Sequence, residues 1–171
     1  LIYDMVEYYD LCKPLHIPYI PLHTEKPPKD NLYYERVPLL KYFSESKEPS
    51  DRHLVSRLLQ AFNNDGQFQN QETYDAVTEC LESIKTSSEK MHVPWSAYLL
   101  QIADYVDIAW TKSLVCPGRG SGVGFILLYM LGITQINPLR EKTKTYSWRF
   151  LNPERASVLD IDVDVCSSKR D

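Results

Sequence analysis

The stretch Asp160-Ile161-Asp162-Val163-Asp164-Val165 alternates three aspartates with three apolar residues. In a β-strand this spacing puts the carboxylates on one face, about 6–7 Å apart along the strand, and the apolar side chains on the other. Aspartate is disfavoured in strands and like charges on one face repel, so we expect a positive charge to balance that face. A divalent cation, or a pair of them, suits it. The same alternation is also typical of a half-buried strand whose charged side lies in water.

Upstream of the aspartates lies a glycine-rich loop, Pro117-Gly118-Arg119-Gly120-Ser121-Gly122-Val123-Gly124. The short apolar stretch 114–116 before it predicts a strand, and the apolar run 125–131 after it predicts a buried helix ended by Gly132. Strand, glycine turn and helix together favour phosphate binding through free backbone N–H groups. The loop lacks the lysine of a Walker A motif, and Val123 stands where the dinucleotide fingerprint requires glycine. Arg119 and the Ser121 hydroxyl remain as anion-binding groups, and a plain tight turn is the alternative.

The rest of the chain predicts helices. Apolar residues recur at helical spacing over 2–12, 31–46, 51–63, 72–89 and 95–110, whereas the proline-rich stretch 13–31 predicts irregular structure.

The 171 residues carry a net charge of −4. Residues 1–111 hold 10 Lys and Arg against 17 Asp and Glu, while residues 112–171 hold 9 against 6. The C-terminal third is therefore where we expect an anion to dock.

Some classes of protein are disfavoured by composition. The four cysteines are scattered and form no CxxC pair, which argues against a zinc site or a disulfide framework and suits a reducing cytoplasm. No run of eighteen apolar residues is present, so we expect no membrane span.

Ordered sequence blocks in the C-terminal third resemble those of one family, the bacterial C-family replicative DNA polymerases (the α subunit of DNA polymerase III). They are Pro117-Gly118-Arg119-Gly120-Ser121, Leu131-Gly132-Ile133-Thr134, Asn137-Pro138-Leu139, Arg149-Phe150-Leu151-Asn152-Pro153-Glu154-Arg155 and Asp160-Ile161-Asp162-Val163-Asp164. The resemblance is strong from about residue 95 onward and weaker before it.

The resemblance implies an α+β fold, in which a helical N-terminal segment precedes part of a palm with a polymerase β-like nucleotidyltransferase fold. It implies that Asp162 and Asp164 are catalytic carboxylates that bind two Mg²⁺ ions, with Asp160 as a further metal ligand on the same face. Gly120 and Ser121 would line the site of the incoming dNTP, and Arg119 and Arg155 would contact its phosphates.

The same resemblance sets the expected organisation. Residues 1–70 would link an absent N-terminal phosphoesterase-like domain to the palm, and residues 71–171 would form its first part. The third catalytic aspartate, the thumb and the fingers would lie elsewhere. We therefore expect a fragment of a DNA-directed DNA polymerase with little activity of its own.

The expected partners are primer–template DNA, dNTP, the remainder of the polymerase and other replisome subunits, with no membrane, in the cytoplasm of a bacterium or a phage-infected host. Two alternatives stay open. One is a nucleotidyltransferase that uses another acceptor, and the other is a non-catalytic replisome assembly module.

Overall fold

The structure is a computed structural model that describes residues 26–140, 146–154 and 160–166. Its elements run in the order α2 (Tyr33–Arg36), α3 (Pro38–Ser44), α4 (Pro49–Asn64), η1 (Gly66–Phe68), α5 (Gln71–Met91), α6 (Trp95–Lys112), η2 (Ser121–Gly124), α7 (Ile126–Met130) and η3 (Ser147–Arg149), where η marks a short 3₁₀ helix.

Three of the five helices expected from apolar periodicity are confirmed. Those over 51–63, 72–89 and 95–110 appear as α4, α5 and α6, each slightly longer than expected. Asn70 caps α5, its side-chain oxygen accepting a hydrogen bond from the Thr73 N–H at 3.0 Å. The expected helix over 31–46 is divided into α2 and α3 at Val37, whose backbone is not helical (φ −133°, ψ 84°) because the following proline disfavours helical backbone there.

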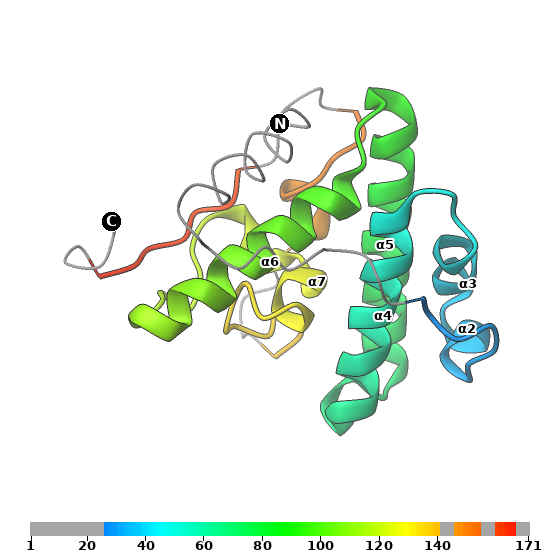
Figure 1. Cartoon of the computed structure of the whole chain (residues 1–171), viewed down its shortest axis with the longest axis horizontal. Coiled ribbons are helices and arrows are strands. Elements are labelled where there is room, and N and C mark those ends of the chain that lie inside the picture. The colour runs from blue at the N-terminus through cyan, green and yellow to red at the C-terminus, as the bar shows by residue number, and fades with distance from the viewer. Residues whose placement is uncertain (1–25, 141–145, 155–159, 167–171) are drawn as a thin grey trace, which may run out of the picture.

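The core lies where the helices meet. α4 and α5 each contact α3, α6 and α7, with α2 and α3 on one side of them and α6 and α7 on the other (Figure 1). Each long helix turns fully buried apolar side chains inward, for example Leu58 of α4, Leu81 of α5 and Leu99 of α6. This burial is the main stabilising term of the fold.

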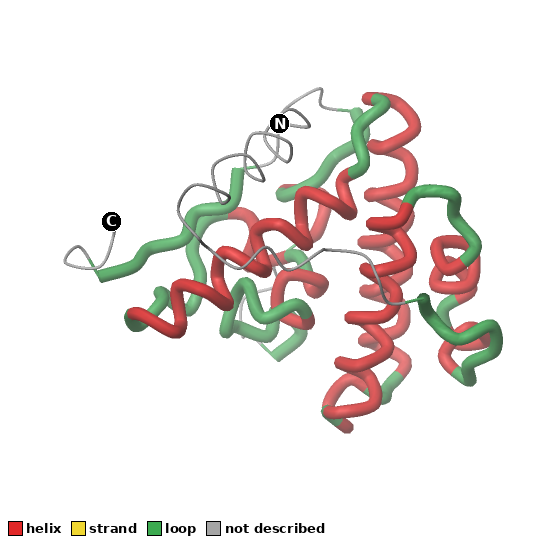
Figure 2. Tube along the Cα trace, in the orientation of Figure 1, coloured by secondary structure: helices red, strands yellow, loops and turns green. Residues whose placement is uncertain are grey.

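The expected α+β fold is wrong. Residues 26–140, 146–154 and 160–166 contain helices and loops but no β-strand or sheet (Figure 2). The one β-type contact among them is an isolated antiparallel bridge between Val115 and Val165. The apolar stretch 114–116 and the aspartate stretch 160–165 are thus extended and meet, but a single bridge without a third partner is too little to make a sheet.

Some expectations concern residues outside those described, namely the helix over 2–12, most of the proline-rich stretch 13–31, and Arg155. The division into 1–70 and 71–171 stays a prediction. Of the helices that the structure describes, none combines the length and the apolar character needed to cross a bilayer.

Candidate functional site

Two segments, 113–124 and 160–166, come together at one end of the molecule, and we call them the aspartate corner. The Cys116 N–H donates to the Asp164 carbonyl at 2.8 Å, and the Cys166 N–H donates to Ser113 Oγ at 3.2 Å. With the Val115–Val165 bridge, these bonds fix the aspartate segment against the start of the glycine loop.

The aspartate segment alternates in exposure as its sequence indicates. Asp160, Asp162 and Asp164 are exposed, whereas Ile161, Val163 and Val165 are half-buried and pack against the core. The period-two reading of this stretch is therefore confirmed at the level of side chains, although the segment is not a strand. The apolar face of the segment packs against the helical core, and Asp162 and Asp164 on its acidic face contact Arg119 of the glycine loop.

The positive charge that faces the aspartates is Arg119. Its Nη2 lies 3.3 Å from Asp162 Oδ1 and its Nη1 lies 3.4 Å from Asp164 Oδ2, so one guanidinium bridges both carboxylates. The three side chains stay accessible, at 56% exposure for Arg119, 40% for Asp162 and 55% for Asp164. The hydrogen bond and charge of Asp162, together with the charge of Asp164, raise the pKa of Arg119 above its ordinary value. The site is thus a solvated charge cluster.

Gly120 brings the loop close to Asp162. It has φ +70° and ψ −164°, a conformation that L side chains rarely adopt. A Cβ built on Gly120 would stand 3.3 Å from Asp162 Oδ2. Glycine is therefore required here both by the backbone angle and by the approach of a carboxylate.

The glycine loop packs against α7 and against η3 and the residue that follows η3, Phe150. A Cβ on Gly122 would lie 2.9 Å from Leu128 Cδ1, so the turn sits directly on α7. The rings of Phe125 and Phe150 are tilted against each other, with centroids 4.9 Å apart and an interplanar angle of 53°. Ser121 begins η2 and is exposed, which leaves its hydroxyl accessible. The expected buried helix is confirmed as α7, but η2 stands between it and the glycine turn.

Two contacts at or just before the aspartate segment were not foreseen from the sequence. Tyr98 of α6 reaches the start of the aspartate segment. Burial and the charge of Asp160 raise its pKa, and a hydrogen bond with the Ile161 backbone lowers it. Lys90 Nζ donates to the Pro153 carbonyl at 2.8 Å and ties α5 to the turn before the aspartates. Both residues lie on helices far from the aspartates in sequence, so no local pattern reveals them.

The donor set fits a divalent cation. Two carboxylates that converge on one guanidinium supply hard oxygen ligands, and Mg²⁺ is commonly held by one or two carboxylates with water and phosphate oxygens. Within the described part of the chain, no group of three or more His, Cys, Asp or Glu side chains is arranged to hold a metal. The corner therefore offers a two-carboxylate site at Asp162 and Asp164, while the charge of Asp160 acts on Tyr98.

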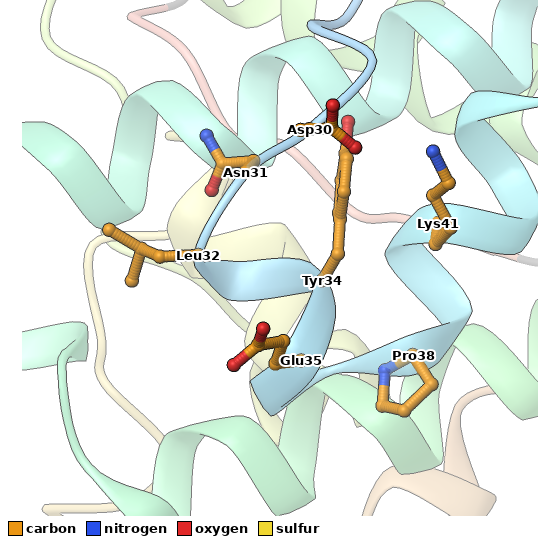
Figure 3. Close-up of a pocket in the computed structure, with 7 residues that line it drawn as sticks. All are labelled: Asp30, Asn31, Leu32, Tyr34, Glu35, Pro38 and Lys41. Atoms are coloured by element: carbon orange, nitrogen blue, oxygen red, sulfur yellow. The ribbon is translucent and has the colours of Figure 1, made fainter.

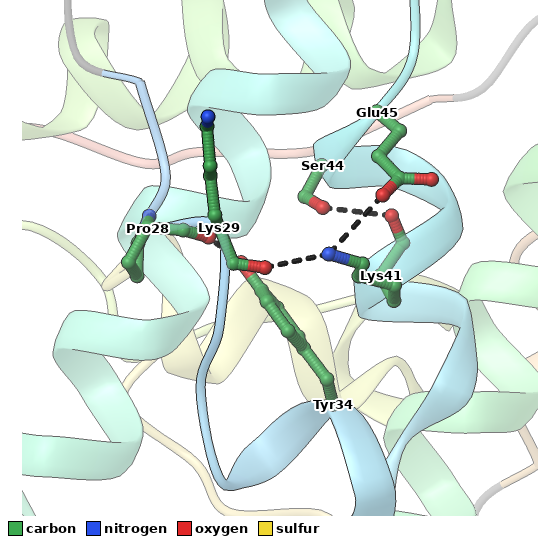
Figure 4. Close-up of polar contacts among 6 residues, drawn as sticks. All are labelled: Pro28, Lys29, Tyr34, Lys41, Ser44 and Glu45. Atoms are coloured by element: carbon green, nitrogen blue, oxygen red, sulfur yellow. Dashed lines mark hydrogen bonds and ion pairs between the residues drawn. The ribbon is translucent and has the colours of Figure 1, made fainter.

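A hollow of about 750 Å³ lies beside α2 and α3 (Figure 3), away from the aspartate corner. Its basic group, Lys41, is already engaged: the ammonium donates to the Lys29 carbonyl at 2.5 Å and pairs with Glu45 at 3.1 Å (Figure 4). The same ammonium lies 5.4 Å from the centroid of the Tyr34 ring. These contacts assign Lys41 a role in joining the segment before α2 to α3, and the hollow gathers none of the residues expected at the site.

Comparison with known proteins identifies the family. Residues 52–171 match the family described as "Bacterial DNA polymerase III alpha NTPase domain". The chain is 47% identical over 75 residues to DNA polymerase III subunit alpha of Chlamydia pneumoniae, covering 43% of this chain and 6% of that protein. It is 30% identical over 189 aligned positions to the probable DNA polymerase YorL of Bacillus subtilis, covering 99% of this chain and 14% of that protein. The DNA-directed DNA polymerase of Bacillus phage SPbeta gives the same values.

The chain thus spans between 6% and 14% of the length of these relatives. With 120 of its residues inside the family match and a glycine loop and aspartate segment that meet in space, the chain belongs to the bacterial DNA polymerase III α family.

Proposed function

We propose that this chain supplies the carboxylate corner of a DNA-directed DNA polymerase, which transfers a dNMP to a primer 3′-hydroxyl under the direction of a template. The observation that carries the proposal is the convergence of Asp162 and Asp164 on Arg119, beside a glycine turn, in a chain of this family. Phosphoryl transfer is catalysed mainly by positioning and by stabilisation of charge, and both can be supplied by such a cluster.

Each residue of the proposed site has a role that follows from its chemistry. Asp162 and Asp164 would hold Mg²⁺, with Asp160 as an accessory carboxylate on the same face. Two Mg²⁺ ions, when bound, would lower the charge on the attacking and leaving oxygens of an in-line displacement. Gly120 would let the triphosphate approach the backbone, and Ser121 would donate its exposed hydroxyl to a phosphate oxygen. Arg119 and Arg155 would neutralise phosphate charge.

The partners of this proposal are primer–template DNA, dNTP, the remainder of the polymerase and other replisome subunits, in the cytoplasm of a bacterium or a phage-infected host. Because the chain corresponds to a small share of its relatives, we expect activity from the longer polypeptide and little from the isolated 171 residues.

Primer extension by the longer polypeptide tests the proposal. We expect Asp162→Asn or Asp164→Asn to lower templated extension at least about a hundredfold, the scale seen when one group that stabilises developing charge is removed. Asp104→Asn, which changes a half-buried aspartate on α6, is the matched control and should keep the wild-type rate within a few fold.

Templated and untemplated primers separate the alternatives. Loss of both reactions in the Asp162→Asn variant, with no preference for the templated nucleotide in the wild type, would indicate transfer to another acceptor. Full activity of both variants would indicate a non-catalytic assembly module and would refute the proposal.

A further inference from the structure

Arg119 occupies the same carboxylate oxygens that a divalent cation would need. Its guanidinium takes Asp162 Oδ1 and Asp164 Oδ2, one from each carboxylate. The other oxygen of Asp162, Oδ2, faces Gly120. A cation bridging the two aspartates therefore has to approach the oxygens at which the guanidinium stands.

From this we infer that Arg119 is an internal counter-ion, displaced from Asp162 and Asp164 when a divalent cation binds and thereby released to bind phosphate. The inference rests on the proposed function and deepens it. It assigns one side chain two successive partners, carboxylate first and phosphate second.

The local structure permits this exchange. The backbone of the corner is held by the Cys116–Asp164 and Ser113–Cys166 hydrogen bonds, neither of which involves Arg119. The Arg119 side chain is more than half exposed, so it can leave the carboxylates without opening any packed core. Exposed ion pairs are weak enough for a doubly charged ion to displace them.

Charge density sets the order of partners. A divalent cation brings two positive charges to the carboxylate oxygens, whereas the guanidinium of Arg119 brings a single delocalised charge. The cation therefore keeps the aspartates neutralised once the arginine has left. The freed guanidinium then presents a planar fork, which matches the geometry of phosphate oxygens. Its neighbours in the chain, Gly120 and Ser121, are the residues assigned to the triphosphate.

This exchange predicts opposite effects of one substitution on two ligands. Arg119→Gln removes the competitor and should raise the affinity of the chain for Mg²⁺ about two- to fivefold, the range expected from losing exposed ion pairs. The same variant should lower the affinity for dNTP at saturating Mg²⁺ by at least about fivefold, because a charge-assisted phosphate contact is lost.

The measurement is isothermal titration of the 171-residue chain with Mg²⁺ alone, and then with dNTP at saturating Mg²⁺. Lys112→Gln is the matched control, since it removes the same charge from an exposed residue just before Ser113 and outside the Arg119–Asp162–Asp164 cluster. It should behave as wild type in both titrations. Arg119→Lys keeps the charge but cannot bridge both carboxylates, so its Mg²⁺ affinity should lie between those of wild type and Arg119→Gln.

The outcomes are distinct. Opposite shifts in Arg119→Gln with an unchanged Lys112→Gln support the inference. A Mg²⁺ affinity in Arg119→Gln equal to or below that of Lys112→Gln overturns it, and leaves the proposed function standing if Mg²⁺ still requires Asp162. Absence of Mg²⁺ binding in the wild type and every variant overturns the inference, whereas the proposed function is decided separately by primer extension with the longer polypeptide.

Discussion

Within the described residues, two arginines each bridge a pair of aspartates, and they stand in different surroundings. Arg57 of α4 lies 3.8 Å from Asp104 and 3.6 Å from Asp107, both on α6. Arg119 lies slightly closer to its two aspartates, but they are on an extended segment and the arginine is on a loop. The residue types are the same in both clusters, and the backbone that carries them is not.

That difference in backbone explains the difference in role. The Arg57 side chain is only 25% exposed and is held between two long helices whose packing fixes all three residues. The Arg119 side chain is 56% exposed and lies next to Gly120, which is itself exposed. We conclude that the first cluster joins helices, whereas the second is arranged to exchange partners.

The largest effect on stability should come from the helical body beside the first cluster. Leu58 follows Arg57 on α4 and is fully buried, so Leu58→Ala should lower the free energy of unfolding by about 2–5 kcal/mol. Denaturant titration measures this loss. Leu114→Ala, at the aspartate corner where the side chain is 81% exposed, is the control and should change it by less than about 0.5 kcal/mol. Equal losses would contradict the assignment of stability to the helices.

The next effect concerns the backbone of the second cluster. Gly120→Ala forces a side chain onto a left-handed φ and toward Asp162 Oδ2, so it should cost about 1–3 kcal/mol and disturb the carboxylate pair. Mg²⁺ affinity should fall as well. Gly66→Ala is the matched control, since a Cβ there meets no atom within 4 Å. A Gly120→Ala variant with wild-type stability and Mg²⁺ affinity would show that the close approach is not needed.

A smaller effect should appear in the pH dependence of the first cluster. Desolvation raises the pKa of Asp104, Arg57 lowers it and Asp107 raises it. Because the net shift is upward, the charged form of Asp104 opposes folding, and its contribution to stability falls as pH rises from the ordinary carboxyl range through the raised pKa. Arg57→Gln removes the cation that stabilises charged Asp104, so the fall with pH should become steeper. Above that pH range the free energy of unfolding should be about 0.2–1 kcal/mol lower than in the wild type.

Urea midpoints across the acidic and neutral range measure this dependence. Arg119→Gln serves as the control, because the Arg119 side chain is 56% exposed against 25% for Arg57 and an exposed ion pair contributes little to stability. Its curve should parallel that of the wild type. A steeper fall in Arg119→Gln than in Arg57→Gln would reverse the roles assigned to the two clusters.

The helical body was predictable because its signals are local. Apolar residues at helical spacing located α4, α5 and α6, and Pro38 explains the one helix that was divided. The α+β expectation failed because a sheet is decided by partners elsewhere in the chain. Alternation at Asp160–Val165 correctly indicated which side chains are exposed, but it could not reveal that Val115 is the only bridge partner among the described residues.

At the candidate site, residue types were predictable and pairings were not. The sequence indicated a positive charge opposite the aspartates and a glycine loop with a free arginine. It did not indicate that Arg119 itself meets Asp162 and Asp164, since the pairing depends on how the two segments meet around α7. The contact of Tyr98 with the aspartate segment depends likewise on the packing of α6.

A Mg²⁺ titration of two double variants tests the central claim most directly. The claim is that Asp162 and Asp164 form a metal-binding pair, whereas Asp104 and Asp107 form a structural one. The account predicts that the chain with both Asp162→Asn and Asp164→Asn binds no Mg²⁺ at concentrations that saturate the wild type, and that the chain with both Asp104→Asn and Asp107→Asn binds it with wild-type affinity. Equal Mg²⁺ affinity in the two double variants would contradict the account.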